Sequence, residues 1–248
     1  MGGLARRASV FKDIRGKSGD APTFFIAGPR EFLPMDGTLA KDMALPLSNA
    51  YALLGYDLGL AGIPEAEWLK ANNAPLPPGW MVCSEKPQER VLDAKDGRVG
   101  VLMLPCAAKS GEGLGAEQLD AIRKSVRSLR ERTRLVIGLS PWGYMMEMGF
   151  LKDQPGLFDI LLGTGSGPGL QVAFSPDSRT LWVRSYTKGQ GPNIIEVVRW
   201  PSGKPDWQWK AGDSIRAGVI GLGDNIAGDE EVSAILANVV RAKNDDIK

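Results

Sequence analysis

The sequence of 248 residues contains no histidine at all. Imidazole is the usual nitrogen ligand of zinc, manganese and iron in hydrolytic sites, and histidine is the side chain that most readily exchanges a proton near neutral pH. Chance alone would supply a few histidines in a chain of this length. The absence excludes histidine-based acid–base catalysis and histidine-ligated metal chemistry.

The chain also lacks a charge imbalance and a long apolar run. Thirty basic and 29 acidic residues give a net charge of +1, which offers no electrostatic reason to expect binding to nucleic acid or to an anionic membrane surface. No apolar run approaches the roughly 18 residues of a membrane span, and no signal peptide precedes the first predicted helix. With 43% hydrophobic residues, we predict a single domain over residues 1–248.

Cysteine is scarce, because Cys83 and Cys106 are the two cysteines of the chain. Their spacing matches neither a disulfide framework nor a metal-binding motif. Each follows a predicted strand, Trp80–Val82 and Val99–Leu104, so the two side chains are expected near one another. We expect buried free thiols rather than a bridge, because free cysteine often packs as a small hydrophobic residue. A secreted location would favour the bridge.

The stretch from Gly138 to Gly169 organises the rest of the chain. Apolar runs at Leu135–Leu139 and Phe158–Leu162 are typical of buried strands, and residues 163–169 form a glycine-rich loop. The segments that follow the two strands are expected at one edge of a sheet, where α/β folds place their sites.

The remaining elements are predicted from periodicity and from turn residues. The strands Trp80–Cys83 and Arg98–Leu104 are expected to be neighbours in one sheet. The last three predicted strands of the chain are expected to form an antiparallel meander. The predicted elements are a helix with Leu4, Ala8, Phe11 and Ile14 on one face, a strand Thr23–Ala27, a helix ending at Leu54, a short helix Glu65–Asn72, a helix Ala116–Arg132, the strands Leu170–Phe174, Leu181–Tyr186 and Ile194–Trp200, and a final helix capped by Gly228-Asp229.

Several short motifs together resemble a known family. Leu139-Ser140, Pro155-Gly156, Asp159 and Leu162-Gly163 are similar to the C-terminal half of a calcineurin-like metallophosphoesterase domain of the 5'-nucleotidase (UshA-like) type, whose pattern is Leu-Ser-His-x-Gly, Pro-Gly-x-Asp and Leu-Gly-Gly-His-x-His. Leu54-Gly55-Tyr56-Asp57 resembles a strand entry from its N-terminal half. The resemblance implies an α/β (α+β) sandwich of α/β/β/α type, with mixed sheets covered by helices. The family's first strand has no counterpart here, so either the start has been trimmed or the protein has dispensed with that strand.

The resemblance places metal ligands at positions where this chain has none. The family's bridging aspartate falls on Pro29, its Asn-His pair falls on Ile63-Pro64, and its remaining histidines fall on Pro141, Gly165 and Gly167. We therefore predict no catalytic residue, no metal and no cofactor. The vestigial site positions are Gly28, Pro29, Gly62, Ile63, Pro64, Glu65, Ser140, Pro141, Gly163, Gly165 and Gly167.

A framework kept without its ligands suggests a catalytically inactive metallophosphoesterase-like protein that serves as a binding or structural subunit of a larger assembly. The residues that follow the vestigial Ser140 either fill the vacated pocket or form an adaptable apolar surface for a protein partner. These residues are Trp142, Tyr144, Met145, Met146 and Met148. The resemblance implies a periplasmic or otherwise extracytoplasmic location, with the cytoplasm left open.

The sequence leaves two alternatives open. One is a phosphate-ester or nucleotide hydrolase with unorthodox ligands, for which the candidates are Asp57, Glu65, Glu147 and Asp159. The other is a metal-free binder of a small phosphate or nucleotide, which uses the backbone amides of residues 163–169.

Overall fold

The computed structural model describes residues 3–33, 39–95, 97–106, 114–185, 191–204 and 206–245. The described chain is of the mixed α/β class, as the sequence predicts, with several sheets and helices. It divides into two compact units. The first comprises Met1–Val82, Lys188–Gly191 and Gly221–Lys248, and the second comprises Cys83–Thr187 and Pro192–Ile220. The single domain over residues 1–248 stays a prediction.

The first unit contains a small parallel sheet in the order β1-β2-β3. Its strands are β1 (Ile26–Ala27), β2 (Leu58–Ala61) and β3 (Trp80–Val82). All four residues of β2 are buried, as expected for a central parallel strand. Because the strands are parallel, the segments that follow β1 and β2 leave the sheet at the same edge.

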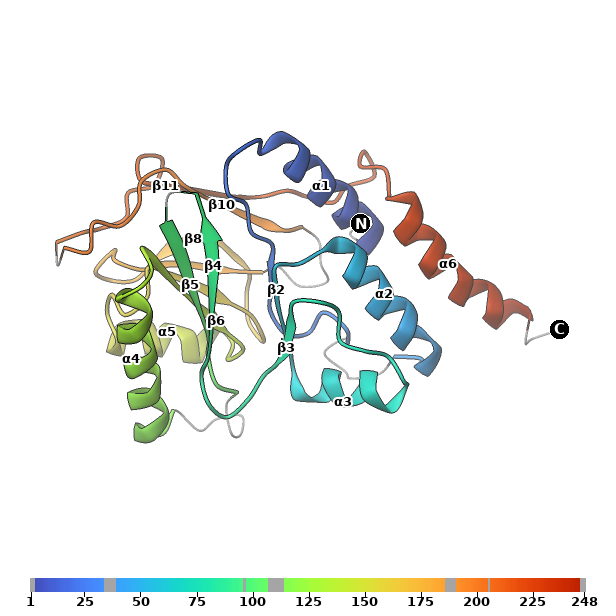
Figure 1. The fold of residues 1–248 in the computed structure, drawn as a ribbon, viewed down its shortest axis with the longest axis horizontal. Coiled ribbons are helices and arrows are strands. Elements are labelled where there is room, and N and C mark those ends of the chain that lie inside the picture. Colours follow the sequence, from blue (N-terminus) through green and yellow to red (C-terminus); the bar gives the residue numbers. More distant parts are fainter. Residues whose placement is uncertain are drawn as a thin grey trace. The chain divides into compact units, whose positions relative to one another are not determined.

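Three helices of the first unit pack together, namely α1 (Leu4–Lys17), α2 (Ala44–Leu54) and α6 (Glu230–Asp245) (Figure 1). Pro46 stands in the first turn of α2, where its missing N–H has no intrahelical partner to lose. The predicted cap of the last helix is confirmed, because the Asp229 carboxylate accepts a hydrogen bond from the Val232 amide at 3.1 Å.

The second unit is built on a six-stranded sheet in the order β4-β5-β6-β7-β9-β8. The four inner strands are parallel, and each edge strand runs antiparallel to its neighbour. The strands are β4 (Gln88–Ala94), β5 (Gly97–Met103), β6 (Leu135–Ser140), β7 (Ile160–Gly163), β8 (Leu170–Phe174) and β9 (Leu181–Arg184). The carboxyl ends of β6, β7 and β9 therefore share one edge.

The helices α4 (Ala116–Arg130) and α5 (Tyr144–Asp153) connect the parallel strands of this sheet and pack on it (Figure 1). The stripe predicted for α4 is confirmed, because Ile122, Val126 and Leu129 are buried against the sheet and Leu119 packs beside them. Phe150 and Leu151 of α5 join the same hydrophobic core.

Two predictions of strand pairing are wrong, the second of them only in part. β3 pairs with β2 in the first unit, whereas β5 pairs with β4 and β6 in the second, so Trp80–Cys83 and Arg98–Leu104 do not lie in one sheet. The predicted meander is right for its first two strands, because β8 pairs antiparallel with β9, and wrong for the third, because β10 (Asn193–Val197) pairs with β11 (Ile215–Val219) rather than with β9. Apolar patterns identify strands but not their partners. Tyr186 lies outside the described residues.

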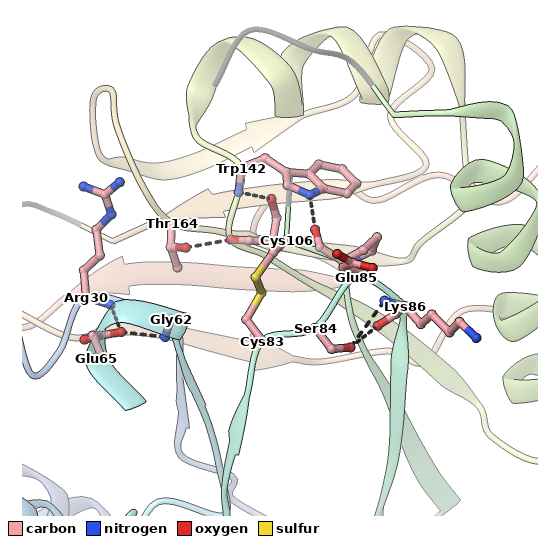
Figure 2. The surroundings of a disulfide bond; sticks show 12 residues. Arg30, Gly62, Glu65, Cys83, Ser84, Glu85, Lys86, Cys106, Trp142 and Thr164 are labelled. Carbon is pink, nitrogen blue, oxygen red and sulfur yellow. Dashed lines mark hydrogen bonds between the residues drawn. A yellow bond between two sulfur atoms is a disulfide. The ribbon is translucent and has the colours of Figure 1, made fainter. Parts of the chain in front are cut away.

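Cys83 and Cys106 form a disulfide, so the expectation of free thiols is wrong (Figure 2). Their Cα atoms are 5.9 Å apart, and the Cys106 amide donates to the Ser84 carbonyl at 2.9 Å. The reason is β4, which the sequence analysis did not predict. It pairs antiparallel with β5, so the two cysteines flank the open end of one hairpin and are brought within bridging distance.

In the part of the chain that the structure describes, no helix combines the length and the apolar character needed to cross a membrane. This agrees with the absence of a membrane span predicted from the sequence.

Candidate functional site

The site predicted around Ser140 lies in the second unit, at the carboxyl ends of β6 and β7. Ser140 ends β6, Gly163 ends β7, and the two residues are register partners in the sheet. The Ser140 carbonyl accepts hydrogen bonds from the Thr164 amide at 3.0 Å and from the Thr164 hydroxyl at 2.7 Å. The start of the glycine-rich loop is therefore tied to the end of the neighbouring strand.

Glu147 from α5 is buried beneath this edge with 0% of its side chain exposed. Its Oε1 accepts from the Ser140 hydroxyl at 2.9 Å and from the Thr164 amide at 3.2 Å, and its Oε2 accepts from the Trp182 indole at 2.9 Å. Oε2 also forms an ion pair with the Arg184 guanidinium. Both carboxylate oxygens are thus fully engaged by groups of the same unit.

Arg184, the last residue of β9, is the cation of this pair and is 1% exposed. Besides Glu147, its guanidinium contacts four backbone carbonyls of the glycine-rich loop. Nε donates to Pro168 at 3.0 Å, and Nη2 lies within 2.9–3.3 Å of the carbonyls of Thr164, Gly165 and Ser166. The loop therefore turns its acceptors inward, which suits a cation rather than an anion.

The glycines of this loop have steric reasons for their presence. A Cβ atom at Gly163 would lie 2.1 Å from Glu147 Oε2. Gly165 and Gly167 have φ angles of 77° and 112°, which side chains rarely adopt, and a Cβ at Gly167 would lie 2.4 Å from that of Tyr144. The buried pair and the first turn of α5 fill the space that larger residues would need.

The vestigial positions of the first unit also gather at one sheet edge. Gly28 and Pro29 follow β1, and Gly62 caps α3 (Ile63–Ala71), whose first turn contains Ile63, Pro64 and Glu65. Glu65 is 3% exposed. Its carboxylate accepts from the amides of Gly62 at 2.7 Å and Arg30 at 2.9 Å (Figure 2), and from those of Phe32 at 2.8 Å and Leu33 at 3.4 Å. The Glu65 carboxylate is therefore fully engaged by backbone amides of its own unit.

The other two carboxylates considered as ligands, Asp57 and Asp159, precede their strands and so lie at the amino ends. Asp57 accepts from the Phe25 amide at 2.7 Å. Asp159 accepts from the Val136 amide at 2.7 Å and from Arg130 at 3.2 and 3.3 Å. Burial raises the pKa of Asp159, against the opposing effect of Arg130 and the Val136 amide. Within each unit, one candidate carboxylate lies at the amino ends of the strands and the other lies at the carboxyl ends.

The five residues predicted as a contact surface differ in exposure. Met145 and Met148 of α5 are 71% and 41% exposed. Trp142 packs against Phe150 and donates its indole N–H to the Pro105 carbonyl at 2.6 Å (Figure 2). Tyr144 stacks on Trp182, and Met146 is half-buried. The two methionines are therefore the members of the set that face solvent most fully.

These residues do not fit the binuclear metal centre that the resemblance implies. Proline, isoleucine and glycine stand at the ligand positions, and both buried glutamates already use their oxygens on internal donors. Over residues 3–33, 39–95, 97–106, 114–185, 191–204 and 206–245, no group of three or more histidine, cysteine, aspartate or glutamate side chains is placed to hold a metal ion. The described residues therefore offer no ligand set for the family's two-metal hydrolysis.

Arg184 and Trp182 are the members of this cluster that the sequence analysis missed. The sequence predicts a strand over Leu181–Tyr186, and all four residues of the observed strand β9 (Leu181–Arg184) are buried. An arginine at the end of an apolar strand is a signal that an acidic partner is required, because an unpaired buried charge is strongly unfavourable. The partner, 37 residues earlier in the chain, could not be found from spacing.

Comparison with known proteins identifies the fold. No family model matches the chain, and a search of curated proteins gives no match. The chain is similar in structure to the NAD nucleotidase NadN of Haemophilus influenzae, with a TM-score of 0.65 at 9% identity, over 98% of this chain and 55% of that one. A hypothetical protein from Thermus thermophilus matches with a TM-score of 0.44 at 16% identity, over 73% of this chain and 70% of that one.

The likeness to NadN supports the metallophosphoesterase-like α/β fold predicted from the sequence. At 9% identity it is evidence for the fold alone, and the chain spans about half the length of that protein.

Proposed function

We propose that this chain is a catalytically inactive metallophosphoesterase-like protein that acts as a binding or structural subunit of a larger assembly. The observation that carries the proposal is that the carboxylates of Glu65 and Glu147 are buried and already accept hydrogen bonds. Each is a buried carboxylate at a sheet edge where the family places its site, and each is satisfied by donors of its own unit. A carboxylate used in this way has no lone pair left for a metal ion or a reacting group.

The Cys83–Cys106 bridge supports an extracytoplasmic location for this subunit. Disulfides form and persist in oxidising compartments and are rare where thioredoxin and glutathione keep thiols reduced. The location proposed from the family resemblance and the presence of a bridge thus agree. Mass analysis of the protein isolated from its own source, with and without prior reduction, tests this: recovery of the free thiols alone would oppose it.

Metal analysis and turnover test the inactive state together. Protein purified without chelator is analysed by elemental mass spectrometry, and hydrolysis of a generic phosphate ester is measured with added Mn²⁺. We expect no stoichiometric metal and no turnover above a blank. About two metal ions per chain with turnover, as in two-metal hydrolases, would overturn the proposal and favour the hydrolase with unorthodox ligands.

The proposed partner-binding surface is the solvent-facing part of α5, represented by Met145 and Met148. Flexible, polarisable methionines are well suited to adaptable apolar contacts. A Met145→Glu/Met148→Glu variant is expected to lose the co-purifying partner and to elute as the isolated chain, whereas Lys124→Glu on α4, which is also exposed, is expected to keep the partner. Recovery of the wild-type chain alone from its native source would count against a subunit role.

A further inference from the structure

The family resemblance and the second unit disagree about what lies beneath the glycine-rich loop. The resemblance expects histidine ligands at Gly165 and Gly167 to hold a metal ion. In the second unit, the backbone carbonyls of this same loop converge on the Arg184 guanidinium instead. The positive charge at this edge is therefore supplied by the chain.

The set of acceptors around Arg184 is similar in chemistry to the oxygen shell of a bound cation. It consists of one carboxylate, from Glu147, and four carbonyls, from Thr164, Gly165, Ser166 and Pro168. Carboxylate and carbonyl oxygens are the ligands that hard cations take in proteins. A guanidinium offers five N–H donors in a fixed plane, so one side chain is able to satisfy several of these acceptors at once.

The same pair also positions the first turn of α5. The Tyr144 amide donates to the Ser166 carbonyl at 2.9 Å, and that carbonyl is one of the acceptors of Arg184. The Arg184 guanidinium lies 5.9 Å from the centre of the Tyr144 ring, on its face. Glu147, one turn further along α5, holds the Thr164 amide. Loop and helix are thus joined through one buried ion pair.

We propose that the buried Glu147–Arg184 pair replaces a bound cation as the element that orders the loop of residues 163–169 and the start of α5. Arg184 is a positioning residue in this proposal. The order of the loop then does not depend on any metal ion, and it is lost when the guanidinium is removed.

Amide hydrogen exchange at Thr164 and Tyr144 reports this order directly, because the Thr164 amide donates to the Ser140 carbonyl and to the Glu147 carboxylate, and the Tyr144 amide donates to the Ser166 carbonyl of the loop. We expect Arg184→Met to accelerate exchange at these two amides by at least about tenfold, since it leaves Glu147 buried without a counter-charge. Arg184→Lys, which keeps the charge but loses the planar fork, is expected to accelerate exchange by a smaller factor. It also provides the measurement if the methionine variant does not fold.

Arg130→Met is the matched control. It breaks the pair with Asp159 at the amino end of β7, so we expect faster exchange at the Val136 amide and unchanged exchange at Thr164 and Tyr144. Equal exchange at Thr164 and Tyr144 in wild type and Arg184→Lys would overturn the proposal, as would equal acceleration of all three amides by both arginine substitutions.

A second experiment uses the wild-type protein and needs no substitution. Added Mn²⁺ or Zn²⁺, or removal of divalent ions with a chelator, is expected to leave exchange at Thr164 and Tyr144 unchanged. Protection that rises with metal or falls with chelator would mean that a bound ion orders the loop, and the proposal would then be wrong. The arginine variants test the ion pair alone, so their failure is distinguishable from failure of the proposed function.

Discussion

Each unit has a buried glutamate at the carboxyl ends of its parallel strands, but the hydrogen-bond donors that its carboxylate accepts from differ between the units. Glu65 in the first unit is held by four backbone amides, including that of the residue that caps its own helix. Glu147 in the second unit is held by a hydroxyl, an indole, one amide and a guanidinium. The first arrangement is stabilised by a helix N-terminus and neutral donors, whereas the second requires a buried cation.

This difference has an energetic consequence. A carboxylate held by amides leaves no charged group behind when it is neutralised. A carboxylate paired with a buried arginine leaves an uncompensated charge, and the penalty for that is several times larger than the loss of a hydrogen bond. The two glutamates should therefore differ in their contribution to stability although both are buried.

The largest effect is expected for Glu147→Gln. Loss of the carboxylate leaves Arg184 buried and unpaired, so the free energy of unfolding should fall by about 3–5 kcal/mol in urea titration. Glu117→Gln, at an exposed position of α4, is the control and should change little. Replacing both partners with methionine should recover most of the loss, because well-packed apolar residues often substitute for a buried ion pair. A larger loss in the double variant would contradict this account.

Removal of the disulfide should affect the second unit next most strongly. The bridge joins residues 23 positions apart, and a closed loop of this size is worth about 3 kcal/mol in the loop-entropy account. Cys83→Ser/Cys106→Ser should lower the free energy of unfolding by that order and speed exchange of the β4 amides that bond to β5. Exchange in β2 of the first unit should change less, and an equal change there would show that the two units unfold together.

Glu65→Gln should have a smaller effect than Glu147→Gln. The amide keeps one acceptor oxygen but presents an NH₂ group to backbone donors, so we expect a loss of about 1–2 kcal/mol. Glu67→Gln, exposed on the same helix, is the control. Equal losses for the two buried glutamates, measured in the same denaturant series, would break the comparison between the amide-held and the arginine-held carboxylate.

The smallest effect concerns pH and the cap of α6. The hydrogen bond from Lys12, together with the Val232 amide, lowers the pKa of Asp229 below its usual value. The folded state therefore binds this proton less readily than the unfolded state, so the contribution to stability is present above about pH 4 and is lost as pH falls further. Asp229→Asn should remove this acid-dependent part while retaining most of the cap, with a loss below about 1 kcal/mol near neutral pH. An unchanged acid profile in Lys12→Met would exclude Lys12 as its main cause.

The parts of the fold that sequence predicted well are those set by local periodicity. The stripe of Ile122, Val126 and Leu129 identified α4, the apolar runs identified β6 and β7, and Asp229 marked the start of α6. In each case the deciding interactions lie within one element or between an element and the core. A pattern of apolar residues records such burial directly.

The parts that were missed depend on pairing between distant residues. β4 is a half-exposed edge strand with the charged residues Glu89, Arg90 and Asp93, so its sequence has no apolar pattern that predicts a strand. The disulfide that flanks its hairpin was missed for the same reason. Glu147 was considered only as a metal ligand, because its partner Arg184 is brought to it by the strand order of the sheet. Spacing along the chain contains no information about such contacts.

The conformations of Gly165 and Gly167 constrain the routes by which this chain can change. Histidine introduced at Gly167 would meet both an unfavourable φ and the Tyr144 side chain, while Arg184 would still occupy the space beneath the loop. A metal site at this edge would therefore require the loop, the arginine and the glutamate to change together, since histidine at Gly167 alone is expected to be destabilising. The buried pair and the conformation of the loop thus oppose the introduction of metal ligands at this edge.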